Sequence, residues 1–454
     1  MSSLDAKLAQ HAAGVRFEHL SPQAIEAAKI FLLDSIGVGV AGGSTPEVTP
    51  LLSAVSQWGE GAKVSLWGRR AKLTASQAVL VNAYQVHCQE FDCLHEGAVL
   101  HAMATLLPVL LAEAQQMRSP VTGRALLAAL AAGVDVSCTI GMASKLGLRF
   151  FRPAASGGFG AVAGLANLRG FDAPTTLAAF GHQLAQVSGT MQAHTEGSVV
   201  LPLQIGVNAR AAFQSCDLAQ SDFPSLQTPL TGRFGYLPMF ESEWDLESAM
   251  QGLGERWRLT ELSHKPYPSG RATHGGIEGL SILRQQANFA ASDVAEIVVT
   301  GPSLLNHLVN RPGLEQPTPN YARLCMPFVL AKVLQHGALD PMHFRSDALT
   351  DPETYALSLK VRMEKDDNPN PNALVPQRVT VRLKDGTVLQ HAIDAMLASP
   401  KRPLSREAQL SKFHRCWALS AESMGSPEPL IALVESFEHC TDAGQLISLL
   451  SPAV

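Results

Sequence analysis

Two stretches of the sequence concentrate side chains that could move protons or bind anions. The first is Gln89-Glu-Phe-Asp-Cys-Leu-His-Glu-Gly97, and it is followed by His101 and the apolar run Met103–Leu111. Polar residues this dense, placed after a helical pattern and before an apolar run, suit the wall of a buried site. Taken alone, an Asp or His such as Asp92 or His101 is more often a helix cap or a satisfied core residue.

The first stretch also contains side chains of the types that ligate metals. His87 and Glu90 lie three residues apart on one helical face, and Asp92, His95 and His101 are near in sequence. This spacing matches no closed set of metal ligands. We therefore expect no metal at this site, and a metal-dependent hydro-lyase is the least favoured reading.

The second stretch is Lys265-Pro-Tyr-Pro-Ser-Gly-Arg-Ala-Thr-His274. Its prolines and Gly270 predict a loop that carries Lys265, Tyr267, Arg271 and His274. Loops where domains meet often form ligand sites. Arginine can bind a carboxylate through two parallel hydrogen bonds, which leaves a neighbouring histidine free to move a proton. The stretch favours a substrate with carboxylates, and a solvated basic loop is the alternative.

Helical signals dominate the chain to about residue 260. Ser21-Pro22 starts a helix that should end at Gly37, Thr74-Ala-Ser-Gln77 is a capping box, and Thr122–Gly133 is a third helical pattern. Small residues in Gly157–Gly170 and Thr175–Gly189 would let helices approach closely. These patterns predict a compact helical bundle.

The pattern changes near His264 to short runs typical of strands with one buried face. The predicted strands are Ala295–Thr300, Ala356–Met363, and a hairpin of Arg378–Leu383 with Thr387–Ile393. Ser405–Leu419 is helical again. The predicted fold is mainly α, with an all-helical domain of residues 1–264 and 401–454 and a smaller α+β lid of residues 265–400.

Composition restricts the partner and the compartment. Of the 454 residues, 46% are apolar and 17% are charged, with a net charge of -5. Such a chain has no basic field for a nucleic acid or an anionic membrane, so we expect neither as a partner. It can bury enough surface to enclose a cavity. The start lacks a secretory signal, no apolar run is long enough to span a membrane, and the seven cysteines are scattered, which predicts a cytoplasmic protein.

The two stretches together, in this order, resemble the MmgE/PrpD family. Phe91-Asp92 with His101 is similar to an acidic pair and later histidine of that family, and Lys265-Pro-Tyr-Pro…Arg271…His274 is similar to its basic loop. The resemblance covers nearly the whole chain. It implies a large helical domain with an α+β lid, a cleft between them, a homodimer, and cofactor-free lyase or isomerase chemistry on small di- or tricarboxylic acids.

Five positions depart from the family pattern, and one of them is Ala154, where the family often has threonine. Arg152 stands where the family often has histidine, Leu201 where it has lysine, Gln204 where it has histidine, and Phe328 where it has tyrosine. Leu201 and Phe328 make the expected substrate pocket more apolar. We therefore predict a substrate with fewer charges or a larger apolar part than the family's tricarboxylates.

The retained residues support a hypothesis for proton transfer next to a carboxylate. His101 would be the general base and His274 the general acid, or the reverse, and Asp92 would orient His101. The cations Lys265 and Arg271 would hold one carboxylate of a small anionic substrate.

Three more positions complete the candidate site. Tyr267 of the same loop would contact the substrate, and Arg152 would hold a second carboxylate. Leu201 and Phe328 would line the apolar part of the pocket. The leading hypothesis for the function is a lyase of the dehydratase or decarboxylase type. The second hypothesis is an isomerase or epimerase, and the third is an inactive family member with a binding role.

Overall fold

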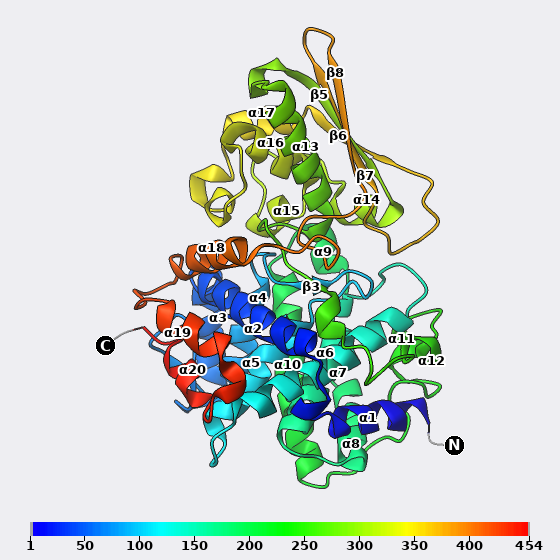
Figure 1. Ribbon diagram of the computed structural model, residues 1–454, viewed down its shortest axis with the longest axis vertical. Helices are drawn as coiled ribbons and strands as arrows, with labels where there is room; N and C mark the ends of the chain where they lie inside the picture. The colour runs from blue at the N-terminus through cyan, green and yellow to red at the C-terminus, as the bar shows by residue number, and fades with distance from the viewer. Residues whose placement is uncertain (1–2, 453–454) are drawn as a thin grey trace.

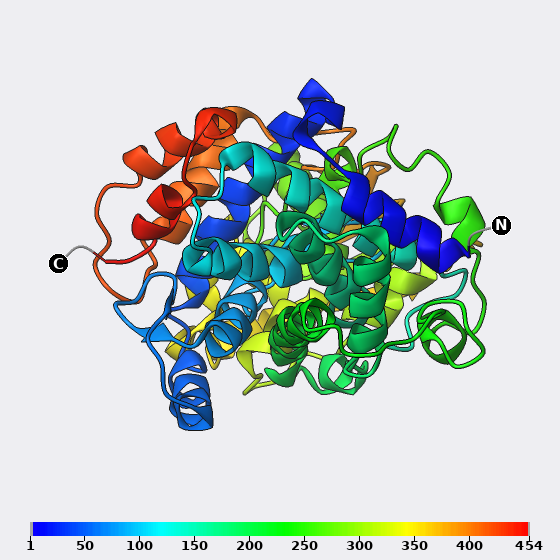
Figure 2. The same ribbon diagram turned by 90° about the horizontal axis from the view of Figure 1, so that it is seen from below.

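Long helices that pack around a shared apolar core form the lower part of the molecule in Figure 1. The computed structural model describes residues 3–452. The bundle helices are α1 (Leu4–Gly14), α2 (Pro22–Gly42), α3 (Val48–Val55), α4 (Ala75–His87), α5 (Ala102–Gln116), α6 (Gly123–Ala143), α7 (Arg152–Leu168), α8 (Ala173–Leu184), α9 (Gln192–Glu196), α10 (Val200–Gln220), α11 (Tyr236–Phe240) and α12 (Leu246–Ala249). Figure 2 shows these helices from below, with the two ends of the chain on opposite sides.

Small residues set how closely the central helices α6 and α7 approach. A Cβ atom on Gly133 would lie 2.7 Å from the carbonyl oxygen of Gly160, and one on Gly160 would lie 2.6 Å from that of Gly133. Only glycine tolerates such backbone contact. Within the described residues, α6 alone is long and apolar enough to cross a membrane, but 89% of its most apolar window is buried inside the protein.

The predicted helix starts are confirmed. Thr74 accepts a hydrogen bond from the backbone of Gln77 in the expected capping box, and Thr122 caps α6. The helix that begins at Pro22 does not end at Gly37, however, and continues to Gly42. A Cβ at Gly37 would lie 2.7 Å from the ring of Phe413, so this glycine serves to seat the C-terminal helix α18 (Arg406–Trp417) rather than to stop α2.

The upper part is a four-stranded sheet covered by helices. Its strand order is β6-β5-β7-β8, with β5 and β6 parallel and the other pairs antiparallel. Its elements are β5 (Val294–Gly301), β6 (Val361–Lys365), β7 (Gln377–Leu383), β8 (Val388–Ile393), α13 (His274–Ala287), α14 (Ser303–Val309), α15 (Pro319–Arg323), α16 (Met326–His336) and α17 (Pro352–Ser358). The mainly α fold with a smaller α+β lid is therefore confirmed.

One predicted strand is partly wrong. Residues 356–358 of the run Ala356–Met363 belong to α17, and only Val361 onward is strand β6. Asp351 caps α17 and Pro352 occupies its first turn, and these two helix-start signals outweigh the strand-like residues that follow.

The chain crosses between bundle and lid through two neighbouring segments. It leaves the bundle after the two-residue strand β4 (Leu262–Ser263), which pairs with β3 (Leu94–His95), and it returns near Ala398. The backbone N–H of His264 donates to the carbonyl of Ala398 at 3.0 Å. The exact division into residues 1–264 with 401–454 and 265–400 stays a prediction.

The tail completes the bundle beside these crossings. Helix α18 packs on α2, and α19 (Glu428–Glu435) and α20 (Gly444–Ser448) follow it. Lys412 of α18 lies 2.6 Å from the Asp34 carboxylate of α2, and both side chains are buried. The remaining pair of short strands, β1 (Val64–Ser65) and β2 (Lys72–Leu73), edges the bundle.

Candidate active site

A small cavity lies where the bundle meets the lid. The bundle contributes Glu90, Leu94, Val99, His101, Leu148, Phe151, Pro153, Met191, His194 and Leu201 to its wall, and the lid contributes Gly270, Arg271, Ala272, Leu308, Val309, Leu324 and Leu374. Its free volume is about 60 Å³, well below the roughly 300 Å³ at which small-molecule pockets begin. A di- or tricarboxylic acid is larger than this free volume, so the wall of the cavity has to rearrange to admit one.

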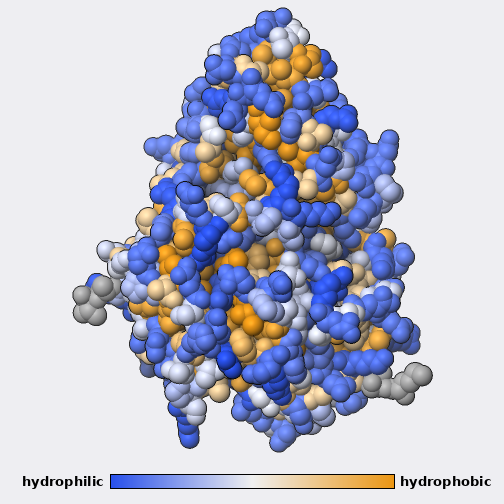
Figure 3. All heavy atoms as spheres, viewed as in Figure 1, coloured by the Kyte–Doolittle hydropathy of each residue, from blue (hydrophilic) through white to orange (hydrophobic). Residues whose placement is uncertain are grey.

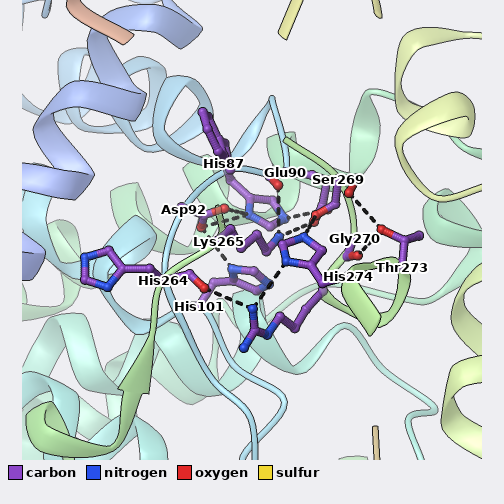
Figure 4. A network of polar contacts seen from close by, with 12 residues as sticks. His87, Glu90, Asp92, His101, His264, Lys265, Ser269, Gly270, Thr273 and His274 are labelled. Atoms are coloured by element: carbon purple, nitrogen blue, oxygen red, sulfur yellow. Dashed lines mark hydrogen bonds and ion pairs between the residues drawn. The ribbon is translucent and has the colours of Figure 1, made fainter. Parts of the chain in front are cut away.

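Asp92 is the centre of a buried cluster beside this cavity (Figure 4). Both of its carboxylate oxygens lie within hydrogen-bonding distance of Nδ1 of His87, at 3.2 and 3.1 Å. Nδ1 of His101 lies 3.1 Å from Oδ2 of the same carboxylate. The two imidazole rings meet edge to face with centroids 4.7 Å apart. One carboxylate thus faces two histidines, and only His101 reaches the cavity wall.

The pKa values of the two histidines are shifted in opposite directions. Burial tends to lower the pKa of His87, but the carboxylates of Asp92 and Glu90 outweigh it, and the pKa is raised. Burial also lowers the pKa of His101, and here Asp92 does not fully compensate, so the pKa stays below its usual value. For Asp92, burial acts to raise the pKa, yet His101 and His87 hold it well below normal. His101 is therefore neutral at pH 7 and can accept a proton.

Glu90 ties the lid segment to the first stretch. Nζ of Lys265 lies 2.7 Å from its carboxylate and donates to its carbonyl at 3.2 Å. Burial acts to raise the pKa of Glu90, but Lys265 and His87 lower it to about 2. Glu90 has a left-handed backbone with φ of 51°, and so does Val99. Backbone strain of this kind is maintained only where surrounding contacts enforce it.

Arg271 lies on the cavity wall with most of its donors already occupied. Its Nε and one Nη donate to Glu96 at 2.9 and 2.7 Å, and the other Nη donates to the carbonyl of His264 and to Nδ1 of His274, each at 3.2 Å. A guanidinium has five N–H groups. One therefore remains for a substrate carboxylate, and a bidentate grip would require Glu96 to give way.

His274 is placed to orient Arg271. Its Nδ1 accepts from Arg271, and its Nε2 lies 3.2 Å from the carbonyl of Ser269, to which it donates. Burial and the Arg271 charge hold its pKa well below normal. Tyr267 packs edge to face on the His274 ring at 5.2 Å. The sequence pattern predicts a loop at His274, but His274 is the first residue of α13, and neither it nor Tyr267 lies on the cavity wall.

The structure does not bring Arg152 to the cavity. Its guanidinium is 1% exposed, and its Nε lies 3.1 Å from the Glu241 carboxylate. It also donates to the Ser144 hydroxyl and to the carbonyls of Ala98 and Leu146. A carboxylate of the substrate would have to displace Glu241 to reach it. In this conformation Arg152 joins the Ala98 loop to the Glu241 segment.

The two apolar departures from the family pattern lie in different places. Leu201 is on the cavity wall, as the predicted apolar pocket requires. Phe328 is buried in the lid core, where its ring centroid lies 5.9 Å from that of Phe344. Phe328 is not among the wall residues, so it would influence the cavity only through the packing of α16.

His194 is a wall residue that sequence analysis does not single out. It lies on the short helix α9, and an Nη of Arg311 lies 3.0 Å from its Nδ1. Burial and Arg311 lower the pKa of His194 to about 3. No motif in its sequence neighbourhood marks it, because only the packing of α9 brings it to the cavity. Glu90, in contrast, stands within the dense polar stretch.

The Asp92 cluster also has the composition of a metal-ligand set. One ligand atom each from His87, Asp92 and His101 lies within 4.8 Å of the others, and among residues 3–452 no other group of three His, Cys, Asp or Glu side chains is arranged in this way. Two imidazoles and one carboxylate can bind divalent transition metals. In the structure each imidazole instead faces the carboxylate directly at hydrogen-bonding distance. The expectation of no metal stays a prediction.

Two family models match the chain. The MmgE/PrpD N-terminal domain covers residues 6–249 and the MmgE/PrpD C-terminal domain covers residues 267–425. Curated relatives include a cis-aconitate decarboxylase of Mus musculus, 26% identical across 96% of this chain and 91% of its own length. Those of Homo sapiens (25% identical, 99% and 95% covered) and Aspergillus terreus (23%, 99% and 96%) are similar over the same extent.

Proposed function

The chain belongs to the MmgE/PrpD family, and from that premise we propose that it is a lyase of the decarboxylase or dehydratase type acting on a small di- or tricarboxylic acid. The observation that carries the proposal is the neutral His101 on the cavity wall, with Asp92 behind its Nδ1 at 3.1 Å. The full-length similarity to cis-aconitate decarboxylases supports the same class of reaction.

His101 is the proposed proton carrier. With Asp92 at Nδ1, its Nε2 is the nitrogen left to take a proton from the carbon next to a carboxylate. Asp92 then stabilises the imidazolium that forms, as a carboxylate partner does for histidine bases in general. A positioned base of this kind contributes about a hundred- to ten-thousand-fold in rate.

Arg271 and the buried cations behind it are proposed to bind the substrate's charge. The free N–H of Arg271 binds a carboxylate, and the enolate-like intermediate is stabilised by the same positive field. Lys265 acts through Glu90, since its ammonium is fully buried against that residue. His274 acts by fixing Arg271 and is a positioning residue in this scheme, which revises the predicted role of general acid.

An epimerase is the second candidate, and His194 favours it. An epimerase needs a second group to return the proton to the carbon. The cavity wall offers the ring of His194 in addition to that of His101. Product analysis separates the two activities, because an epimerase releases neither water nor carbon dioxide.

The decisive experiment is an NMR screen in deuterium oxide with a panel of di- and tricarboxylic acids that includes cis-aconitate. We expect a new alkene signal or loss of carbon dioxide with one of them, and no reaction with the His101→Ala variant. If no acid in the panel reacts or exchanges a proton with the wild-type protein, the chain is a binding member of the family and the proposal fails.

The assembly is also a proposal. On the family resemblance, we propose a homodimer in the cytoplasm. Sedimentation velocity would show a mass of twice 48.4 kDa for a dimer.

A further inference from the structure

Arg323 is a buried cation without a hydrogen-bonded partner at the junction between lid and bundle. It ends α15, which lies at the lower edge of the lid (Figure 1), and it is only 3% exposed. On the face seen in Figure 3, hydrophilic side chains cover most of the surface, where water solvates them. Arg323 lacks that solvation, and among residues 3–452 its guanidinium has no hydrogen-bond acceptor and no carboxylate within ion-pair distance. Its Nη atoms are less deeply enclosed than its Nε.

A second arginine of the lid lies next to Arg323. The guanidinium carbon of Arg323 lies 5.1 Å from the centroid of the Phe344 ring. The next residue, Arg345, donates through one Nη to the hydroxyl of Ser44 in the bundle at 2.8 Å. Within the described part of the chain, Arg345 also has no carboxylate at ion-pair distance. Burial lowers the pKa of Arg323, and the charge of Arg345 lowers it further. Two neighbouring cations, one of them buried, are unfavourable without a counter-ion.

The bundle adds a hydroxyl donor beside these two cations. Thr45 follows Ser44, and its hydroxyl lies 3.7 Å from Sγ of Cys88. Tyr84 lies one helical turn before Cys88, in the same small cluster of buried residues. Tyr84 is 3% exposed, and its hydroxyl has no hydrogen-bond partner in the described chain. Burial raises the pKa of Tyr84, and the nearby charge of Arg323 opposes this shift.

These donors without acceptors restrict the ligand. A guanidinium and a tyrosine hydroxyl both donate hydrogen bonds, and the guanidinium carries a charge that needs compensation when it is buried. Water would accept the hydrogen bonds but leave the charge unpaired, whereas an anion does both. Because Arg323 and Tyr84 are almost fully enclosed, we expect a small ion. The negative charge of Glu47 lies nearby without forming an ion pair with any described residue, and it favours a ligand with a single charge.

We propose that Arg323, Arg345 and Tyr84 form a binding site for a small monovalent inorganic anion of the size of chloride, held between lid and bundle. The two arginines supply positive charge from the lid, and Tyr84 supplies a hydroxyl from the bundle. The site adjoins the His101 cavity without sharing its wall. Leu324, the residue after Arg323, is a wall residue, and the Arg323 carbonyl accepts from the N–H of Gly270, another wall residue, at 3.0 Å. The anion thus holds α15, which leads into the cavity wall, against the bundle.

A titration of the full chain with sodium chloride tests the site without any substrate. The line width of the chlorine NMR signal reports bound chloride, and sodium gluconate keeps the ionic strength constant. We expect saturable binding with a dissociation constant of about 10 mM or tighter. Arg323→Gln should weaken it at least about ten-fold, and Tyr84→Phe, which removes only a hydroxyl, about three- to ten-fold. Arg378→Gln, at an exposed arginine of the lid, is the matched control and should bind as the wild type does.

Anomalous diffraction from crystals grown in sodium bromide locates the ion, because bromide replaces chloride and scatters anomalously. We expect a peak within about 4 Å of the guanidinium of Arg323, the distance of an ion pair. Saturable chloride binding that is equal in the wild type, Arg323→Gln and Tyr84→Phe would overturn the site, and so would a bromide peak only elsewhere.

Glu47→Gln separates the proposal from an internal counter-ion. If Arg323 binds a free anion, the wild type binds chloride and Glu47→Gln binds it equally or more tightly, because a nearby negative charge is removed. If Glu47 itself pairs with Arg323 in solution, only Glu47→Gln binds chloride and the wild type does not. That second outcome overturns the proposal. Neither readout depends on the lyase activity, so the anion site and the proposed function fail or hold separately.

Discussion

Lys412 in the C-terminal helix donates a hydrogen bond to the carbonyl of Phe91 at 2.8 Å, directly before Asp92 in the chain. The same ammonium lies 2.6 Å from the carboxylate of Asp34 and 4.3 Å from the Phe91 ring centroid. A residue more than 300 positions away thus holds the segment that presents the proposed catalytic carboxylate. The C-terminal helix α18 therefore helps to position the candidate site.

The role of Lys412 can be separated into stability and positioning. Lys412→Met leaves Asp34 as a buried unpaired charge, so the free energy of unfolding should fall by about 3 to 5 kcal/mol. The double variant Lys412→Met with Asp34→Leu removes both charges and should recover most of that loss. Its kcat should stay reduced, because the Phe91 carbonyl still lacks its donor. Denaturant unfolding and steady-state kinetics check both statements, and full recovery of kcat in the double variant would contradict the positioning role.

The protonation state of His101 sets a pH dependence. Its pKa lies below the ordinary value of about 6.5, because burial outweighs the effect of Asp92. A reaction that begins with proton removal needs the neutral ring, so kcat/KM should be level at pH 7 and fall as pH drops through this pKa. In a decarboxylation that needs the charged ring as a proton donor, the pH dependence would be the opposite, and kcat/KM would fall as pH rises through this pKa.

Asp92→Asn provides the matched test of that assignment. Asp92 raises the pKa of His101, so its loss should move the acid limb of kcat/KM to lower pH. It should also lower kcat about a hundred-fold or more, since the imidazolium loses its carboxylate partner. Glu278→Gln, which alters a lid carboxylate bonded to Arg402, serves as the control and should leave the limb in place. An unmoved limb in Asp92→Asn would show that the limb belongs to another group.

Arg152 is expected to affect stability more than substrate binding. Arg152→Met leaves the buried Glu241 carboxylate unpaired and should lower the free energy of unfolding by about 3 to 5 kcal/mol. Arg152→Met with Glu241→Leu should restore much of the stability, with KM within about two-fold of the wild type. A KM raised ten-fold or more in the stable double variant would instead support the role in carboxylate binding predicted from the sequence.

The substitution Leu201→Lys tests the predicted preference for less charged substrates. The wild type should bind alkyl-substituted or monoester dicarboxylates more tightly than citrate or aconitate, because Leu201 presents an apolar wall. A lysine there should reverse this order by adding a cation to the cavity. A binding series on both proteins checks it, and tighter binding of citrate by the wild type would refute the preference.

Metal dependence has a direct measurement. We expect purified protein to retain its activity after dialysis against a chelator, and elemental analysis to find less than a stoichiometric amount of any transition metal. Loss of activity that zinc or manganese restores would assign the His87, Asp92 and His101 set to a metal.

The fold was predictable where local signals and tertiary packing agree. The Thr74 capping box, the Thr122 cap and the hairpin around Lys384–Gly386 all form as their residues indicate. The errors occur where a distant segment decides. Gly37 continues a helix because α18 packs on it, and residues 356–358 are helical because Asp351 starts a helix before them.

The same distinction holds for the site. Asp92 and His101 lie close because they belong to one short stretch whose polar residues were recognisable. The family resemblance predicts that Arg152 binds the substrate, because Arg152 stands at the position of a family site residue. No local sequence signal shows that Glu241 pairs with it. The sequence does not predict that His194 lines the cavity, because no local sequence pattern shows which short helix packs against it.

The adjacency of the two crossing segments has a consequence for how such proteins diversify. The chain passes into the lid near His264 and returns near Ala398, with a backbone hydrogen bond between the two segments, so the lid is an insertion between two parts of the chain that both belong to the bundle. Exchanging residues 265–397 between related proteins requires only two junctions a few ångströms apart. Such an exchange would keep the bundle side of the cavity wall, with His101 and Asp92 behind it, and would replace only the lid side of the wall.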